Sequence, residues 1–224
     1  IVLHFIQTQI WYDGLAQDVS VFSSQNSVIV LLVWVLLMEN SRRGMFFGKK
    51  LPISKEINRW ARTYHGYFFA WATIYTFWFH PLVSTPGHLI GFLYMFLLLL
   101  QGSLMYTKVH KNRYWTLTME VLVLVHGTLV AYALEDGLWP MFFFGFGGIF
   151  IITQMHGVGL KLWAKLVFLA AYVGAVLTVF GQLGWSRFDE ILRIPVIDYL
   201  AVLVLGSSGC DAERSSNPLS PNIA

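Results

Sequence analysis

Long apolar segments, separated by short polar connections, dominate the hydrophobic pattern of this chain. Six of them come close to the roughly 20 mainly apolar residues that an α-helix needs to cross a bilayer. Runs of this length predict transmembrane helices rather than the amphipathic helices of soluble proteins. We therefore predict an all-α integral membrane protein with six transmembrane helices. The six spans are expected at 21–38, 60–79, 88–106, 114–134, 139–156 and 163–183.

Three shorter segments flank this six-helix domain, which covers 21–183. Residues 1–20 mix apolar residues with Gln and Asp and predict an interfacial N-terminal segment. Residues 184–205 join a polar stretch to an apolar run that is short for a span, which indicates an interfacial or re-entrant segment. Residues 206–224 are rich in Ser, Pro and Asn and predict a disordered tail.

Composition and charge placement support the membrane interpretation. The chain is 56% hydrophobic and only 12% charged, whereas soluble domains carry about 25% charged residues. Lys and Arg gather in the connections at 39–59, 108–113 and 157–165, and the connections between them lack this enrichment. By the positive-inside rule, these three connections face the cytoplasm or its equivalent, and the N-terminus lies on the outer side. A single Cys excludes an internal disulfide and a Cys-based metal site.

The connection at 39–59 is the strongest basic segment. Its Lys and Arg residues alternate with Met and Phe beside a span, a pattern typical of a loop that lies on anionic lipid headgroups. We expect the lipid bilayer and other membrane-protein subunits as partners, and no nucleic acid. Within this loop, Ser54 is placed to cap the helix that leads into the second span.

An internal repeat relates spans two and three to spans four and five. Residues 65–72 and 126–133 share the pattern His-Gly-x-x-x-Ala-aromatic-Ala. Spans three and five match more loosely, each with an early Gly-Phe pair and a late Gln, at Gln101 and Gln154. Repeats of this kind often place a ligand between the two copies. Close packing of helices through small residues is the alternative explanation of the match.

Ionisable side chains within spans are costly and indicate functional sites. His65, His126, His156 and Glu120 meet this description, and Gln101 and Gln154 add uncharged polar groups. Counted from the basic connections, His65 and His156 are expected near the inner surface, Glu120 somewhat deeper and His126 near the middle. His80 and His88 are expected at the opposite surface.

The histidines suggest haem. Two imidazoles from facing helices ligate b-type haem, and a neighbouring glycine lets the flat macrocycle approach the backbone. His-Gly occurs at 65–66, 126–127 and 156–157. With these pairs, its four core helices and its two-sided histidines, the stretch 60–161 resembles the membrane b-type cytochromes of the cytochrome b561 and ferric-reductase-like families.

The resemblance implies an oxidoreductase that passes electrons across the membrane through haem b. It makes His65, His126 and His156 candidate ligands of haem iron, with His80 and His88 as further cofactor-binding candidates. His65 would pair with His156 on the inner side, and His126 with His80 or His88 on the outer side. In one respect the chain departs from the b561 pattern, because His126 lies deeper than His65.

Two other classes of function remain open. A single imidazole also ligates the magnesium of chlorophyll, so the chain can be a pigment-binding or structural accessory subunit of a respiratory or photosynthetic complex, with chlorophyll or no cofactor. Alternatively, Glu120, Gln101, Gln154 and His156 form the inner polar pocket of a membrane enzyme or carrier. The sequence carries no zinc-protease, nucleophile-elbow or phosphate-loop motif that would name a reaction.

Overall fold

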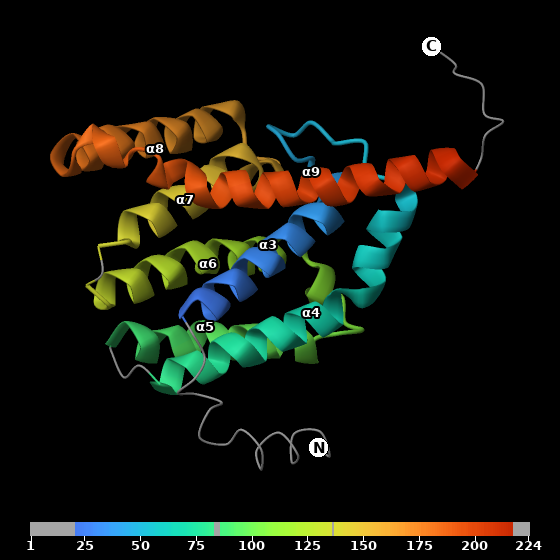
Figure 1. Cartoon of the computed structure of the whole chain (residues 1–224), viewed down its shortest axis with the longest axis horizontal. Helices are drawn as coiled ribbons and strands as arrows, with labels where there is room; N and C mark the ends of the chain where they lie inside the picture. Colours follow the sequence, from blue (N-terminus) through green and yellow to red (C-terminus); the bar gives the residue numbers. More distant parts are fainter. Residues whose placement is uncertain (1–20, 83–85, 136, 217–224) are drawn as a thin grey trace.

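The computed structural model describes residues 21–82, 86–135 and 137–216, and in these residues the chain is helical and has no β-strand. The segment predicted to be interfacial at 1–20, and residues 217–224, lie outside this described part. Short 3₁₀ turns are η1 (Val109–Lys111), η2 (Gln154–His156) and η3 (Trp185–Arg187). The α-helices of Figure 1 are α3 (Val21–Arg43), α4 (Lys55–Leu82), α5 (Pro86–Ser103), α6 (Arg113–Ala133), α7 (Trp139–Ile152), α8 (Leu162–Leu183) and α9 (Glu190–Ser216).

Each of the six apolar segments predicted from the sequence lies largely within a helix, and local signals fix several helix ends. The Ser54 hydroxyl accepts a hydrogen bond of 3.2 Å from the amide of Ile57, which confirms the predicted cap of α4. Asn112 caps α6 in the same way, with bonds from the amides of Tyr114 and Trp115. Gly44 ends α3 in a left-handed conformation (φ 78°), which glycine adopts without strain.

Two helices organise the packing. α3 lies against α4 and α9, while α7 contacts α6, α8 and α9, and α5 joins α4 to α6 (Figure 1). The best-buried large side chains include Leu36 and Leu37 of α3 and Phe144 and Ile149 of α7. We call the end of the bundle with the basic connections 44–54, 104–112 and 153–161 the inner end, and the opposite end the outer end.

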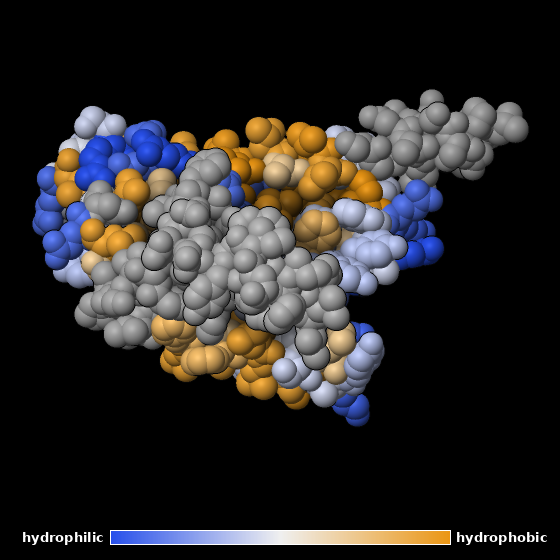
Figure 2. Space-filling model, turned by 60° about the horizontal axis from the view of Figure 1, so that its bottom comes forward, coloured by the Kyte–Doolittle hydropathy of each residue, from blue (hydrophilic) through white to orange (hydrophobic). Residues whose placement is uncertain are grey.

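The surface of the bundle is strongly apolar. On the face shown in Figure 2, hydrophilic residues gather toward the two ends and hydrophobic residues lie between them. α8 packs mainly on α7 and leaves Leu166, Val167 and Leu177 more than half exposed. By length and composition, α6 and α8 are the described helices that could cross a membrane.

α7 is shorter than the span predicted at 139–156, because the α-helix ends at Ile152 and continues only as the 3₁₀ turn η2. Thr153 has left the helical region (φ −123°, ψ −58°), and its hydroxyl donates to the carbonyl of Met45 at 2.5 Å. The amide of Phe47 donates to the carbonyl of Ile152 at 2.8 Å. The turn after α3 therefore supplies partners that another turn of α7 would otherwise provide.

α9 differs from the interfacial segment at 184–205 and the disordered tail at 206–224. It is one helix of 27 residues that continues to Ser216, past residue 206 where the tail is expected to begin. Near its start, Arg187 Nη2 donates to the carbonyl of Gly137 at the outer end, at 2.7 Å. Gly206 lies against Ile53 at the inner end. The helix thus runs the length of the bundle, because packing on α3 and α7 supports residues that are too polar to predict a span alone.

Candidate functional site

An ion pair between α3 and α6 is the most deeply buried ion pair in the described part of the chain. Arg43 Nη1 donates to Glu120 Oε2 at 2.6 Å, and the two side chains are 1% and 6% exposed. Glu120 is one of the intramembrane candidates from the sequence. Arg43 was predicted only as part of the lipid-facing basic loop, although its place directly after an apolar run is a signal for a buried role.

Three polar atoms of this pair have no hydrogen-bond partner among the described residues: Arg43 Nε, Arg43 Nη2 and Glu120 Oε1. Nε and Nη2 are the two donors on one edge of the guanidinium, which matches the two oxygens of a carboxylate or phosphate. Since buried polar atoms in native proteins nearly always have partners, this edge and the free carboxylate oxygen are set up for water or a ligand.

The turn after α3 and the end of α7 close over the ion pair from the inner side. The Thr153 hydroxyl bonds to the carbonyl of Met45, and Arg42 Nη1 donates to the carbonyl of Gly157 at 3.0 Å. A Cβ on Gly157 would lie 3.2 Å from Cβ and Cδ of Arg43, so glycine gives the closest fit here. The segment that carries Gly157 therefore covers part of the Arg43 side chain.

Polar side chains from α5, from α9 and from the residue after α7 lie close to this centre. Tyr94 donates to the carbonyl of Met119, next to Glu120, at 3.1 Å. The hydroxyls of Tyr199 and Thr153 share a hydrogen bond of 2.7 Å. Sequence reasoning missed both tyrosines, because Tyr within an apolar span is common and gives no sign of which partner it meets.

The two predicted amides are placed differently. Gln154 is buried in η2, beside the segment that covers the ion pair. Gln101 ties α5 to the next connection, since it donates to the carbonyl of His110 at 3.2 Å and accepts from Trp115 Nε1 at 2.5 Å. Gln101 therefore has a structural role at the inner end.

His65 and His156, expected as an inner haem pair, have separate neighbours. The His65 ring lies 6.1 Å from that of His110, and its Nδ1 is bonded to the carbonyl of Arg62 at 2.7 Å. His110 lies in the basic connection at 108–113, and no local pattern predicts that it meets His65.

His156 lies in η2, between the carbonyl of Ile151 and the ammonium of Lys165, at 3.2 Å from each. Its ring meets that of Phe47 edge-on, with centroids 6.0 Å apart. Burial lowers the pKa of His156, the positive charge of Lys165 lowers it further, and the bond to Ile151 partly opposes both. His156 is therefore set up as a neutral imidazole.

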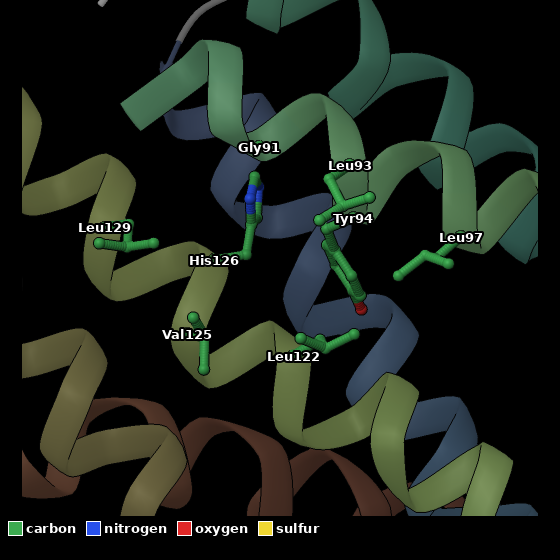
Figure 3. A pocket seen from close by; sticks show the side chains of 8 residues that line it. All are labelled: Gly91, Leu93, Tyr94, Leu97, Leu122, Val125, His126 and Leu129. Atoms are coloured by element: carbon green, nitrogen blue, oxygen red, sulfur yellow. The ribbon is translucent and has the colours of Figure 1, made fainter. Parts of the chain in front are cut away.

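His126 lines a groove between α5 and α6, toward which it projects from α6 (Figure 3). Its ring centroid lies 5.2 Å from that of Tyr94, and the other lining residues are Gly91, Leu93, Leu97, Leu122, Val125 and Leu129. The groove holds about 80 Å³, well below the roughly 300–1,000 Å³ of cofactor pockets, so these residues do not fit a haem as they stand. His80 and His88 lie on α4 and α5, and their side chains are outside the described part.

Haem therefore stays a prediction from the sequence, with no contact among the described residues to support it. Within the described residues, no three His, Cys, Asp or Glu side chains lie close enough together to hold a metal ion.

The two halves of the predicted repeat also differ in their surroundings. A Cβ on Gly66 would meet nothing within 4 Å, whereas one on Gly127 would lie 2.8 Å from Cε2 of Phe146. The glycine after His126 therefore lets two helices pack closely. This agrees, for the second copy, with helix packing through small residues as the explanation of the repeat.

Comparisons of the chain with family models, with curated proteins and with solved structures find no match. The function is therefore argued from the geometry.

Proposed function

We propose that this chain is an integral membrane carrier that binds a small carboxylate or phosphate at an inner site formed by Arg43 and Glu120. The exposed apolar surface of α8 and the apolar zone between hydrophilic ends in Figure 2 support a bilayer as the surroundings. With the basic connections on the cytoplasmic side, the site lies near that surface. The helices that cross are α3 to α8, which correspond to the six predicted spans, with α9 as a seventh.

The free edge of the Arg43 guanidinium is the observation that carries this proposal. Glu120 occupies only Nη1 and leaves the donors Nε and Nη2 without a partner among the described residues. A carboxylate or phosphate would accept from Nε and Nη2 together, while Glu120 Oε1 accepts from a hydroxyl or amine of the same ligand. A bound anion would also compensate for the free-energy cost of desolvating Nε and Nη2 of Arg43.

A carrier fits these residues better than an enzyme. The pair binds and orients an anion, and in the described residues neither Arg43 nor Glu120 is bonded to a hydroxyl or thiol that would serve as a nucleophile. The segments that cover the site, joined by Thr153 with Met45 and by Arg42 with Gly157, would open it toward the inner side. A membrane enzyme with the same pocket is the runner-up.

Anion-dependent thermal stability tests this function. The purified protein in detergent is melted in phosphate, in succinate and in chloride at one ionic strength. We expect phosphate or succinate to raise the melting temperature of the wild type, because a ligand that binds only the folded state stabilises it. Arg43→Lys keeps the charge but loses the two-donor edge, and it should lose the effect.

Arg193→Lys is the matched control, since Arg193 is exposed and pairs with Asp189 at the surface, away from the site. It should retain the anion effect. Equal shifts in all three proteins, or no shift with either anion, would refute the proposed site.

The haem hypothesis remains open to a separate test. A reduced-minus-oxidised absorption spectrum of the purified protein would show the α-band of b-type haem if the chain binds it, and a red-absorbing extract would favour a pigment-binding accessory subunit. His65→Ala and His126→Ala should then each lose bound cofactor.

A further inference from the structure

Asp198 is a fully buried carboxyl in the middle of α9. Its exposure is 0%, and neither carboxyl oxygen has a hydrogen-bond partner among the described residues. It belongs to the buried stripe of α9 with Ile194 and Val202, one helical turn before and one turn after it. Burying an ionisable group in such a place costs free energy, and such groups are by default candidates for a functional site.

The surroundings of Asp198 on α9 are tightly packed. A Cβ on Gly145 of α7 would lie 3.0 Å from Ile194, and one on Gly148 would lie 3.6 Å from Pro195. α9 therefore sits close to the backbone of α7 one turn above Asp198. Pro195 has no amide proton, so the helical bond to the carbonyl of Ile191 is missing, which makes this part of α9 easier to bend.

On the elements that contact α9, the described charged groups are either paired with other residues or exposed. α7 has no acidic or basic residue. On α3, Glu39 pairs with Arg42, and Arg43 pairs with Glu120. The charged residues of α4 that the structure describes begin with Lys55 and Glu56 at its exposed first turn, followed by Arg59 and Arg62, which are exposed as well.

On α9 itself, Arg193 pairs with Asp189 at the surface, Glu190 pairs with Arg187, and the hydroxyl of Tyr199 is bonded to Thr153. None of these groups neutralises Asp198.

A proton is the ligand that suits this carboxyl. An ionised carboxylate without a partner in an apolar interior is so unfavourable that the group takes up a proton instead. Metal cations such as Ca²⁺ need about six oxygen ligands, and no oxygen partner of Asp198 is present in the described residues. We propose that Asp198 is a proton-binding site between α7 and α9, which holds its proton at neutral pH and exchanges it with water when α9 bends at Pro195. This inference does not depend on the anion site at Arg43.

Infrared spectroscopy of the full chain in lipid vesicles tests the protonation. We expect the carbonyl stretching band of a protonated carboxylic acid at pH 7 in the wild type, and its loss in Asp198→Asn. Asp189→Asn is the matched control, because Asp189 is exposed and ion-paired, and it should leave the band unchanged. In D₂O the band should shift, as the proton exchanges. An unchanged band in Asp198→Asn, or a band that never shifts in D₂O, would overturn the proposal.

Chemical labelling gives a second readout that needs no variant. In an apolar setting, the O–H group of a protonated carboxyl adds across a C=N bond of dicyclohexylcarbodiimide. The carboxyl oxygen bonds to the central carbon, the proton goes to a nitrogen, and no group leaves. Mass spectrometry of the labelled wild type should find the adduct on Asp198 and none on the exposed Asp189. Absence of the Asp198 adduct, or its suppression by Na⁺ but not by choline, would reject a proton as the ligand.

Discussion

Arg43 and Glu120, 77 residues apart in the chain, are joined by a buried hydrogen-bonded ion pair of 2.6 Å. The pair ties the inner end of α3 to the second turn of α6, two helices that otherwise meet mainly through their neighbours. A buried ion pair often adds little net stability, because the cost of desolvating both charges offsets their attraction, but the loss of one partner leaves the other charge buried and unpaired. This property leads to a prediction that differs for single and double variants.

Removal of one partner should be far more harmful than removal of both. Glu120→Leu leaves the Arg43 charge buried and unpaired, which should reduce the free energy of unfolding by about 3–5 kcal/mol. Adding Arg43→Met should recover much of that loss, because an apolar pair of similar volume needs no solvation. Thermal or denaturant unfolding in detergent measures both.

Glu39→Ala serves as the comparison, because the Glu39 and Arg42 side chains form a partly exposed pair. Its effect should stay below about 1 kcal/mol. Additive effects of Glu120→Leu and Arg43→Met would show that the two side chains do not depend on each other.

Gly66 and Gly127 occupy equal positions of the predicted repeat and should respond oppositely to alanine. Gly127→Ala places a Cβ 2.8 Å from Phe146, which is only 5% exposed and has little room to move. Overpacking of this kind should cost about 1–3 kcal/mol. Gly66→Ala meets nothing within 4 Å and should gain up to about 1 kcal/mol from better helix propensity.

Unfolding of the two variants side by side in the same detergent measures this difference. Phe146→Leu should restore part of the stability of Gly127→Ala by making space. Equal effects at both glycines would mean that the two copies of the repeat are packed alike.

The helical segments were predictable because each depends on local composition, and the Ser54 cap depends only on residues within one turn. The candidate site was harder to predict from the sequence. Glu120 stood out as a charge within a span, but its partner Arg43 depends on how α3 and α6 approach each other, which no local pattern specifies. The continuation of α9 past residue 205 was missed because the apolar run ends there and the polar residues that follow carry no hydrophobic signal for a helix.

His156 should make the fold sensitive to acid. Burial and the nearby Lys165 lower its pKa from the ordinary 6.5, so the unfolded chain binds the proton before the folded chain does. Stability should therefore fall as the pH drops below about 6.5, and the loss should be complete below the folded-state value. His156→Gln should remove this part of the pH dependence when melting temperatures are compared at pH 8 and pH 5.

Lys165→Met separates the two causes of this shift. It removes the ammonium 3.2 Å from Nδ1 but leaves the ring partly buried, so the loss at acid pH should become smaller without disappearing. If wild type and His156→Gln lose the same stability between pH 8 and pH 5, the acid sensitivity arises elsewhere.

α9 should cross the membrane as a seventh span, which places its two ends on opposite sides. Its 27 residues reach about 40 Å, more than the roughly 30 Å hydrocarbon core. With Cys210→Ser as background, single cysteines at Lys111, Ser186 and Ser207 are treated with a membrane-impermeant maleimide in sealed vesicles. We expect Ser207→Cys to react on the same side as Lys111→Cys, and Ser186→Cys on the other side, because Gly206 lies against Ile53 at the inner end while Arg187 bonds to Gly137 at the outer end. Reaction of Ser207→Cys together with Ser186→Cys would instead make α9 the re-entrant or interfacial element that its short apolar run predicts.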